Sequence, residues 1–224
     1  MSANSKVNVV IMGDSNTEGY GLASPKDSYP YKLNVLLGKN GAVQNFGVSG
    51  TCVINTKDNG RQVGMPYVLE KAYKDALAAN GDIFIVNLGT NDAQDGMDDT
   101  LPVADEYSNL IKYHARFKDD YSVIIDDIKK YHPSAKIFIC IPIPVRQCIW
   151  RKHQEIYLQT IISYFQEILD KYDEVKCIDL HSEFLKLGSA YIDSMYLEDG
   201  LHLNEKGTDY VAAAIKRFVE EEIQ

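Results

Sequence analysis

Five short runs of apolar residues recur along the chain, and each is nearly continuous rather than alternating with polar positions. Many of the side chains in these runs are β-branched, which is typical of parallel strands buried on both faces of a sheet. The runs cover residues 7–12, 42–46, 83–88, 136–141 and 175–180. We therefore predict five parallel strands in the interior of the protein.

Between these runs, apolar residues recur at a spacing near 3.6, which marks one face of a helix. In the clearest case, four apolar side chains of one segment share a face: Ile161, Phe165, Ile168 and Tyr172. This spacing predicts helices over residues 121–131, 152–172 and 205–219. Asn204 can cap the last of them, because its side-chain oxygen can accept a hydrogen bond from the first turn.

Strands and helices alternate through the whole chain, which is typical of an α/β fold with right-handed crossovers. We predict a three-layer α/β/α sandwich around a parallel sheet. No repeat, low-complexity stretch or flexible linker interrupts the pattern, so residues 1–224 are predicted to form a single domain. Irregular stretches at 93–105 and 142–151 follow the third and fourth strands. Both should lie beside a ligand site, because ligands bind beyond the carboxyl ends of such strands.

The composition excludes several classes of partner. The 224 residues are 45% hydrophobic and 25% charged, and a chain of this length can bury a core without a disulfide or a metal. Its net charge of −9 argues against nucleic-acid binding, which depends on lysine and arginine. No apolar run approaches the ~20 residues that span a membrane, and no secretory signal is visible. We therefore expect no nucleic-acid or membrane partner, and a cytoplasmic location unless a leader has been removed.

Neither the cysteines nor the acidic loop after the third strand has the pattern of a metal or redox site. No Cys-x-x-Cys pair occurs, so we expect reduced thiols, buried where they lie in predicted strands. The acidic residues of the loop lack the full pattern of a calcium-binding loop, and we expect a solvated segment. The residues concerned are Cys52, Cys140, Cys148 and Cys177, and Asp92, Asp95, Asp98 and Asp99.

Glycine-bearing polar turns close the first three predicted strands. The first strand runs into Gly13-Asp14-Ser15, the second into Ser49-Gly50, and the third into Gly89-Thr90-Asn91-Asp92. Glycine allows backbone N–H groups to approach a ligand, and an asparagine side chain adds another donor. Acyl transfer needs such donors where negative charge develops on a carbonyl oxygen. Taken singly, each turn could equally be an ordinary βα connection or a helix cap.

An Asp199-Gly200-Leu201-His202 run precedes the last predicted helix. An aspartate and a histidine three residues apart on a turn can face one another, so the carboxylate can hold one ring nitrogen of the imidazole. The other ring nitrogen can then accept a proton from a hydroxyl group. Taken alone, the pair could also be a surface feature that caps a helix.

These motifs, in this order and at this spacing, resemble those of the SGNH hydrolase superfamily, also called the GDSL esterases and lipases. The resemblance covers residues 7–219. It implies a flavodoxin-like fold with a five-stranded parallel sheet and the activity of a carboxylic ester hydrolase. It implies no metal and no organic cofactor.

The resemblance also assigns roles to individual residues. Ser15 would be the nucleophile, His202 the general base and then the general acid, and Asp199 the residue that orients His202. The backbone N–H groups of Ser15 and Gly50 and the side-chain amide of Asn91 would form the oxyanion hole. The reaction would pass through an acyl-enzyme on Ser15 that water cleaves.

Two further carboxylates, Asp14 and Asp92, also match the family motifs. We leave both outside the catalytic set. Instead, we expect them to brace turns by accepting hydrogen bonds from backbone N–H groups.

The substrate is less strongly indicated. The residues around Ser15 and Gly50 resemble a branch of sialate O-acetylesterases and carbohydrate esterases, so we expect an acetyl or short-chain ester of a carbohydrate. A lysophospholipase or thioesterase, an acyltransferase to a sugar, and a non-catalytic flavodoxin-like binding module are the alternatives. Tyrosines and Trp150 can stack on sugar rings, although most tyrosines should be half-buried. Trp150, Arg146 and Arg151 follow the fourth strand and could line the pocket, but we expect them to lie on a surface loop. The oligomeric state is left open.

Overall fold

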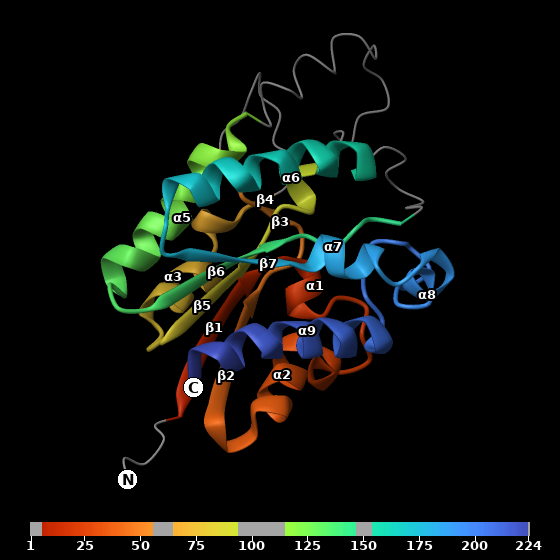
Figure 1. Ribbon diagram of the computed structural model, residues 1–224, viewed down its shortest axis with the longest axis horizontal. Helices are drawn as coiled ribbons and strands as arrows, with labels where there is room; N and C mark the ends of the chain where they lie inside the picture. Colours follow the sequence, from red (N-terminus) through yellow and green to blue (C-terminus); the bar gives the residue numbers. More distant parts are fainter. Residues whose placement is uncertain (1–5, 56–64, 94–114, 147–153, 224) are drawn as a thin grey trace.

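The computed structural model describes residues 6–55, 65–93, 115–146 and 154–223. At its centre is a five-stranded sheet of order β2-β1-β5-β6-β7, with every neighbouring pair parallel (Figure 1). All five predicted strands are present, and the order is that of flavodoxin-like folds. The strands are β1 (Val7–Gly13), β2 (Gly41–Gly47), β5 (Ile83–Asn87), β6 (Lys136–Ile141) and β7 (Val175–Asp179).

Helices cover both faces of this sheet, which confirms the three-layer arrangement. One face is covered by α3 (Lys71–Ala78), α5 (Phe117–Tyr131) and α6 (Gln154–Lys171), and the other by α2 (Tyr29–Leu37) and α9 (Glu205–Ile223) (Figure 1). Shorter helices connect them. These are α1 (Ser15–Glu18), α7 (Leu180–Leu185), α8 (Ser189–Asp193), and 3-10 turns at Pro25–Asp27, Gly38–Asn40, Tyr67–Leu69 and Asn91–Ala93.

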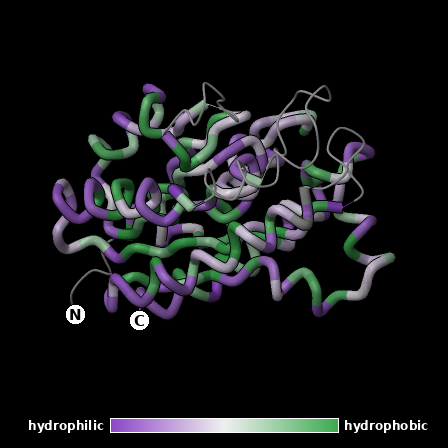
Figure 2. Tube along the Cα trace, turned by 90° about the horizontal axis from the view of Figure 1, so that it is seen from above, coloured by the Kyte–Doolittle hydropathy of each residue, from purple (hydrophilic) through white to green (hydrophobic). Residues whose placement is uncertain are grey.

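The alternation of side chains along β1 produces two apolar cores. Val10 and Met12 pack into the core under α3, α5 and α6, whereas Val9 and Ile11 pack into the core under α2 and α9. Successive side chains of a strand point to opposite faces, so a strand between two helical layers needs apolar residues at every position. In Figure 2, the chain through the middle is mostly hydrophobic, and the surrounding helices alternate between hydrophobic and hydrophilic turns.

The predicted helices are confirmed with shifted ends. The helix predicted from residue 121 begins at Phe117, and the last helix extends to Ile223. Asn204 caps α9 as expected, because its Oδ1 atom accepts hydrogen bonds from the backbone N–H groups of Lys206 and Gly207.

Several short elements were not predicted. Helices α2 and α3 have nine and eight residues, so their apolar spacing has too few repeats to stand out. Strands β3 (Thr51–Cys52) and β4 (Met65–Pro66) pair with each other in a separate two-stranded sheet. Such short strands carry no periodic signal.

Other expectations are tested only in part. Cys140 is buried in β6 and Cys177 is half-buried in β7. Residues 94–105 of the acidic loop, with Cys148, Trp150 and Arg151, lie outside the described residues. No described helix combines the length and the apolar character needed to cross a membrane.

Candidate active site

The turns that carry the first three sequence motifs follow strands β1, β2 and β5, which end in register with one another. Gly13, at the end of β1, is in register with Gly47 at the end of β2 and with Asn87 at the end of β5. The backbone N–H of Val48 donates to the carbonyl of Gly13 over 2.9 Å, which extends the pairing into the turn. This part of the sheet includes the point where the strand order reverses, the usual ligand site of such folds.

Helix α1 places Ser15 at this edge. Asp14 is extended, and its carboxylate accepts a hydrogen bond from the N–H of Asn16, so the helix begins at Ser15. A Cβ atom on Gly47 would lie 2.2 Å from the backbone nitrogen of Glu18. Only glycine at this position allows β2 to approach the backbone of α1 so closely.

Ser15, His202 and Asp199 form one chain of hydrogen bonds. The Nε2 atom of His202 lies 2.9 Å from the Oγ atom of Ser15, and its Nδ1 atom lies 2.7 Å from Oδ2 of Asp199. All three residues are buried, with 6%, 7% and 8% exposure for Ser15, His202 and Asp199. The structure therefore brings together residues that the sequence motifs placed near opposite ends of the chain.

The environment of Asp199 favours the charged carboxylate. Burial opposes its ionisation. Hydrogen bonds from the backbone N–H groups of His202 and Leu201 and from the ring of His202 outweigh burial and hold the pKa of Asp199 below its ordinary value. A charged carboxylate at Nδ1 selects the tautomer whose Nε2 atom accepts a proton. It also stabilises the imidazolium that results. This arrangement can serve as a general base for a hydroxyl group.

Asn16 connects the helix that carries Ser15 to the segment that carries His202. The sequence assigned it no role. Its Nδ2 atom donates to the carbonyl of Leu201 over 3.3 Å, and its Oδ1 atom accepts from the N–H of Leu203 over 3.0 Å. The side chain therefore holds the backbone on both sides of His202 against the helix that carries Ser15. Its position directly after Ser15 was the one available signal.

The second and third motifs are also connected. The Nδ2 atom of Asn91 donates to the carbonyl of Thr51 over 2.9 Å, which places the Asn91 amide beside the turn that contains Gly50. Gly50 has a φ of +76°, a conformation that favours glycine. Ser15, Gly50 and Asn91, the predicted sources of oxyanion donors, thus lie on turns linked at one edge of the sheet.

The prediction that Asp14 and Asp92 brace turns is confirmed. Besides the bond from Asn16 to Asp14, the carboxylate of Asp92 accepts hydrogen bonds from the N–H groups of Val53 and Ile54 over 2.9 to 3.0 Å. Burial raises the pKa of Asp14 to about 6 and that of Asp92 to about 7. Each carboxylate therefore accepts hydrogen bonds from backbone N–H groups, although burial disfavours its charged form.

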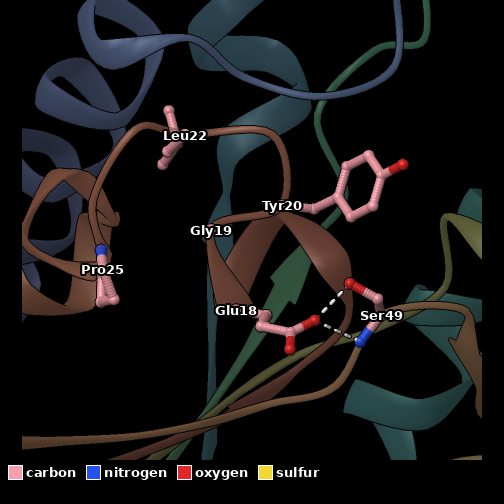
Figure 3. A pocket seen from close by; sticks show the side chains of 6 residues that line it. All are labelled: Glu18, Gly19, Tyr20, Leu22, Pro25 and Ser49. Carbon is pink, nitrogen blue, oxygen red and sulfur yellow. Dashed lines mark hydrogen bonds between the residues drawn. The ribbon is translucent and has the colours of Figure 1, made fainter.

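A hollow of about 350 Å³ opens beside Tyr20 (Figure 3). The ring of Tyr20 lies with its centroid 4.4 Å from the imidazole centroid of His202. Across the hollow, Oε2 of Glu18 accepts hydrogen bonds from both the backbone N–H and the hydroxyl of Ser49. The sequence assigned neither Tyr20 nor Glu18 a role of its own, although both lie in the segment after Ser15 that resembles carbohydrate esterases. The lining residues are Glu18, Gly19, Tyr20, Leu22, Pro25 and Ser49.

Other candidate residues lie away from this hollow. Arg146 forms an ion pair with Asp193 over 2.6 Å and a hydrogen bond with Ser189 on α8. It does not line the hollow, in agreement with the surface position that we expected. Within the part of the chain that the structure describes, no three histidine, cysteine or acidic side chains are grouped to hold a metal ion.

Comparison with known proteins gives matches over most of the chain. A model of the GDSL-like Lipase/Acylhydrolase family matches residues 11–210. An acetylxylan esterase from Xylanibacter ruminicola is 32% identical over 232 aligned residues, which cover 94% of this chain and 43% of that protein. The chain therefore spans less than half the length of this curated relative.

Solved structures show the same fold. The lipase/acylhydrolase from Enterococcus faecalis matches with a TM-score of 0.68 at 20% identity, over 96% of each chain. An acetyl xylan esterase matches with a TM-score of 0.66 at 19% identity, over 95% of this chain and 100% of the other.

Proposed function

The chain belongs to the GDSL-like lipase/acylhydrolase family of carboxylic ester hydrolases, and from this premise we propose that it is a serine esterase that removes acetyl or other short acyl groups from carbohydrates. The observation that carries the proposal is the buried hydrogen-bonded chain of Asp199, His202 and Ser15. A hydroxyl, an imidazole and a carboxylate in this order are the parts that nucleophilic acyl transfer requires.

In the first half of the reaction, the Oγ atom of Ser15 attacks the ester carbonyl carbon while its proton passes to Nε2 of His202. The charge of Asp199 stabilises the imidazolium. The carbonyl oxygen becomes an oxyanion, which accepts hydrogen bonds from the N–H groups of Ser15 and Gly50 and from the side-chain amide of Asn91. Donors held in place by the fold stabilise this charge without reorganisation.

The intermediate then collapses. The bond between the carbonyl carbon and the alcohol oxygen breaks, and His202 gives its proton to that oxygen, so the alcohol leaves and an acyl-enzyme remains on Ser15. A water molecule attacks the acyl group while His202 accepts one of its protons. His202 returns this proton to Oγ of Ser15, and the carboxylic acid is released.

The curated relative supports the choice of an acetylated carbohydrate as the substrate. That protein is an acetylxylan esterase, and its similarity covers nearly all of this chain. The hollow lined by Tyr20, Glu18 and Ser49 offers an aromatic ring and polar groups, a combination suited to a sugar with its apolar ring faces and its hydroxyls.

Two measurements test this function. A fluorophosphonate probe, which reacts with activated serines, should label the wild-type protein and the control variant Ser163→Ala but not Ser15→Ala. Ser163 lies on the exposed side of α6, where its hydroxyl donates to the carbonyl of Thr160. A wild-type protein that resists labelling would point instead to a non-catalytic binding module.

Rates on acetylated xylo-oligosaccharides, on p-nitrophenyl esters of increasing chain length and on acyl thioesters should then be compared. We expect the highest kcat/KM on acetyl and other short-chain esters, with sugar acetates preferred. A preference for long acyl chains would contradict the carbohydrate assignment.

A further inference from the structure

Tyr20 combines contact with the buried centre of the site and exposure to solvent. Its ring packs against the imidazole of His202 at an interplanar angle of 39°, yet the residue is 51% exposed and lines the hollow. The contact with His202 holds the ring beside the imidazole, and the same residue lines the hollow together with Glu18 and Ser49 (Figure 3). A tyrosine in this position presents an apolar face and a polar tip to a ligand.

The proton path indicates which part of an ester reaches this hollow. His202 must deliver its proton from Nε2 to the alcohol oxygen, so that oxygen has to come within about 3 Å of this atom. The alcohol oxygen therefore lies beside the imidazole against which Tyr20 packs. A hollow of about 350 Å³ is far larger than the methyl group of an acetyl ester and is of the size of small-ligand pockets.

Glu18 contributes a carboxylate of fixed orientation to the lining of the hollow. Its Oε2 atom accepts from the N–H of Ser49 over 2.8 Å and from the Ser49 hydroxyl. These two contacts orient the carboxylate, and its Oε1 atom takes part in neither of them. A carboxylate accepts hydrogen bonds from sugar hydroxyls and repels a second carboxylate.

We propose that the hollow binds the sugar ring on the alcohol side of the ester, with Tyr20 as the stacking platform and Glu18 as the acceptor for a sugar hydroxyl. The site would prefer neutral sugars to acidic sugars such as sialic or uronic acids. This inference rests on the proposed esterase function and assigns the substrate class that the site selects.

The test compares two acetates that differ only in the alcohol. The kcat/KM on an acetylated xylo-oligosaccharide is divided by the kcat/KM on ethyl acetate, so that changes in the shared chemistry cancel. We expect Tyr20→Ala to lower this ratio about tenfold, as the loss of one stacked ring should, and Tyr20→Phe to keep most of it. A folded Tyr20→Ala protein with the wild-type ratio would overturn the proposal. So would a change in acyl-chain preference at a constant ratio, which would assign the hollow to the acyl group.

Tyr131→Ala is the matched control. This tyrosine is also about half exposed, but it ends α5 on the side where β6 begins, at the edge of the sheet opposite Ser15. Its removal should leave the ratio unchanged. A fall equal to that of Tyr20→Ala would show that any exposed tyrosine contributes, which would contradict a defined site.

A binding measurement separates this proposal from the esterase function. In the Ser15→Ala background, titration calorimetry with the acetylated xylo-oligosaccharide should show binding that weakens about tenfold when Tyr20→Ala is added. If the wild type hydrolyses neither acetate, the esterase function fails, and this titration still decides whether the hollow holds the sugar. Binding that does not change with Tyr20→Ala would overturn the site.

The charge preference is tested with Glu18→Gln. Glutamine keeps an oxygen that can accept from Ser49 but removes the negative charge. Relative to a neutral sugar acetate, kcat/KM on an acetylated acidic sugar should rise about threefold at low salt, and less at high salt because ions screen the repulsion. An unchanged ratio at low salt would overturn the selection against acidic sugars.

Discussion

The Nε2 atom of His202 lies 2.9 Å from the Oγ atom of Ser15, although 187 positions separate the two residues in the chain. Contacts outside the site help to hold these two residues close together. The hydroxyl of Thr208 in α9 donates to the carbonyl of Asp27, and Lys32 of α2 donates to the carbonyl of Glu205, each over 2.7 Å. The packing of α9 against α2 therefore carries His202 to the edge of the sheet where Ser15 begins its helix.

Removing the imidazole should remove most of the activity. In the proposed mechanism Nε2 of His202 accepts the proton of Ser15, and the lowered pKa of Asp199 favours a negative charge beside Nδ1 that stabilises the imidazolium. His202→Ala should lose about 10²–10⁴ in kcat/KM in initial-rate measurements. A variant as active as the wild type would remove His202 from the mechanism.

Asn91→Ala should lower kcat by about 10²–10³ with a smaller effect on KM, because an oxyanion donor acts mainly in the transition state. Steady-state kinetics on a short-chain ester measure this effect. Asn34→Ala is a suitable control, since Asn34 lies in α2 and bonds to the N–H of Val43. A loss below about threefold for Asn91→Ala would mean that its bond to Thr51 is its main role.

Asn16→Ala should separate the two sides of the site, because both bonds to the segment around His202 are lost. We expect a loss of about 1–3 kcal/mol in the free energy of unfolding, measured in urea. We also expect kcat to fall by about tenfold or more, since a small misplacement of reacting groups is costly. Lower stability with the wild-type kcat would assign Asn16 a purely structural role.

Asp92→Asn should change how stability depends on pH. The pKa of Asp92 is raised in the folded protein from 3.8 to about 7, so its protonation favours the folded state. This contribution is fully present below about pH 4 and is lost as the pH rises through about 7. The free energy of unfolding of the wild type should therefore fall relative to that of Asp92→Asn over this interval, in urea titrations at several pH values. A constant difference between the two proteins would contradict the raised pKa.

Much of the fold could be predicted because burial leaves a periodic record in the sequence. All five runs became strands of the sheet, but burial on both faces holds best for central strands such as β5. The edge strands β2 and β7 keep exposed positions, because each has a neighbouring strand on one side only. The bracing by Asp14 could also be predicted, because its partner is the backbone of Asn16, two residues away. Short elements such as α2 and β3 left no comparable record.

The sequence by itself determined the alternation of strands and helices, the turns that end the strands, and the family to which their motifs belong. Only the tertiary structure decided that Asn16 bonds to both sides of His202, that Tyr20 packs against its ring, and that Glu18 and Tyr20 line one hollow. The physical reason is that local pattern reflects burial and nearby backbone hydrogen bonds. Contacts between residues far apart in the chain depend on how whole helices pack against the sheet, which no local pattern encodes.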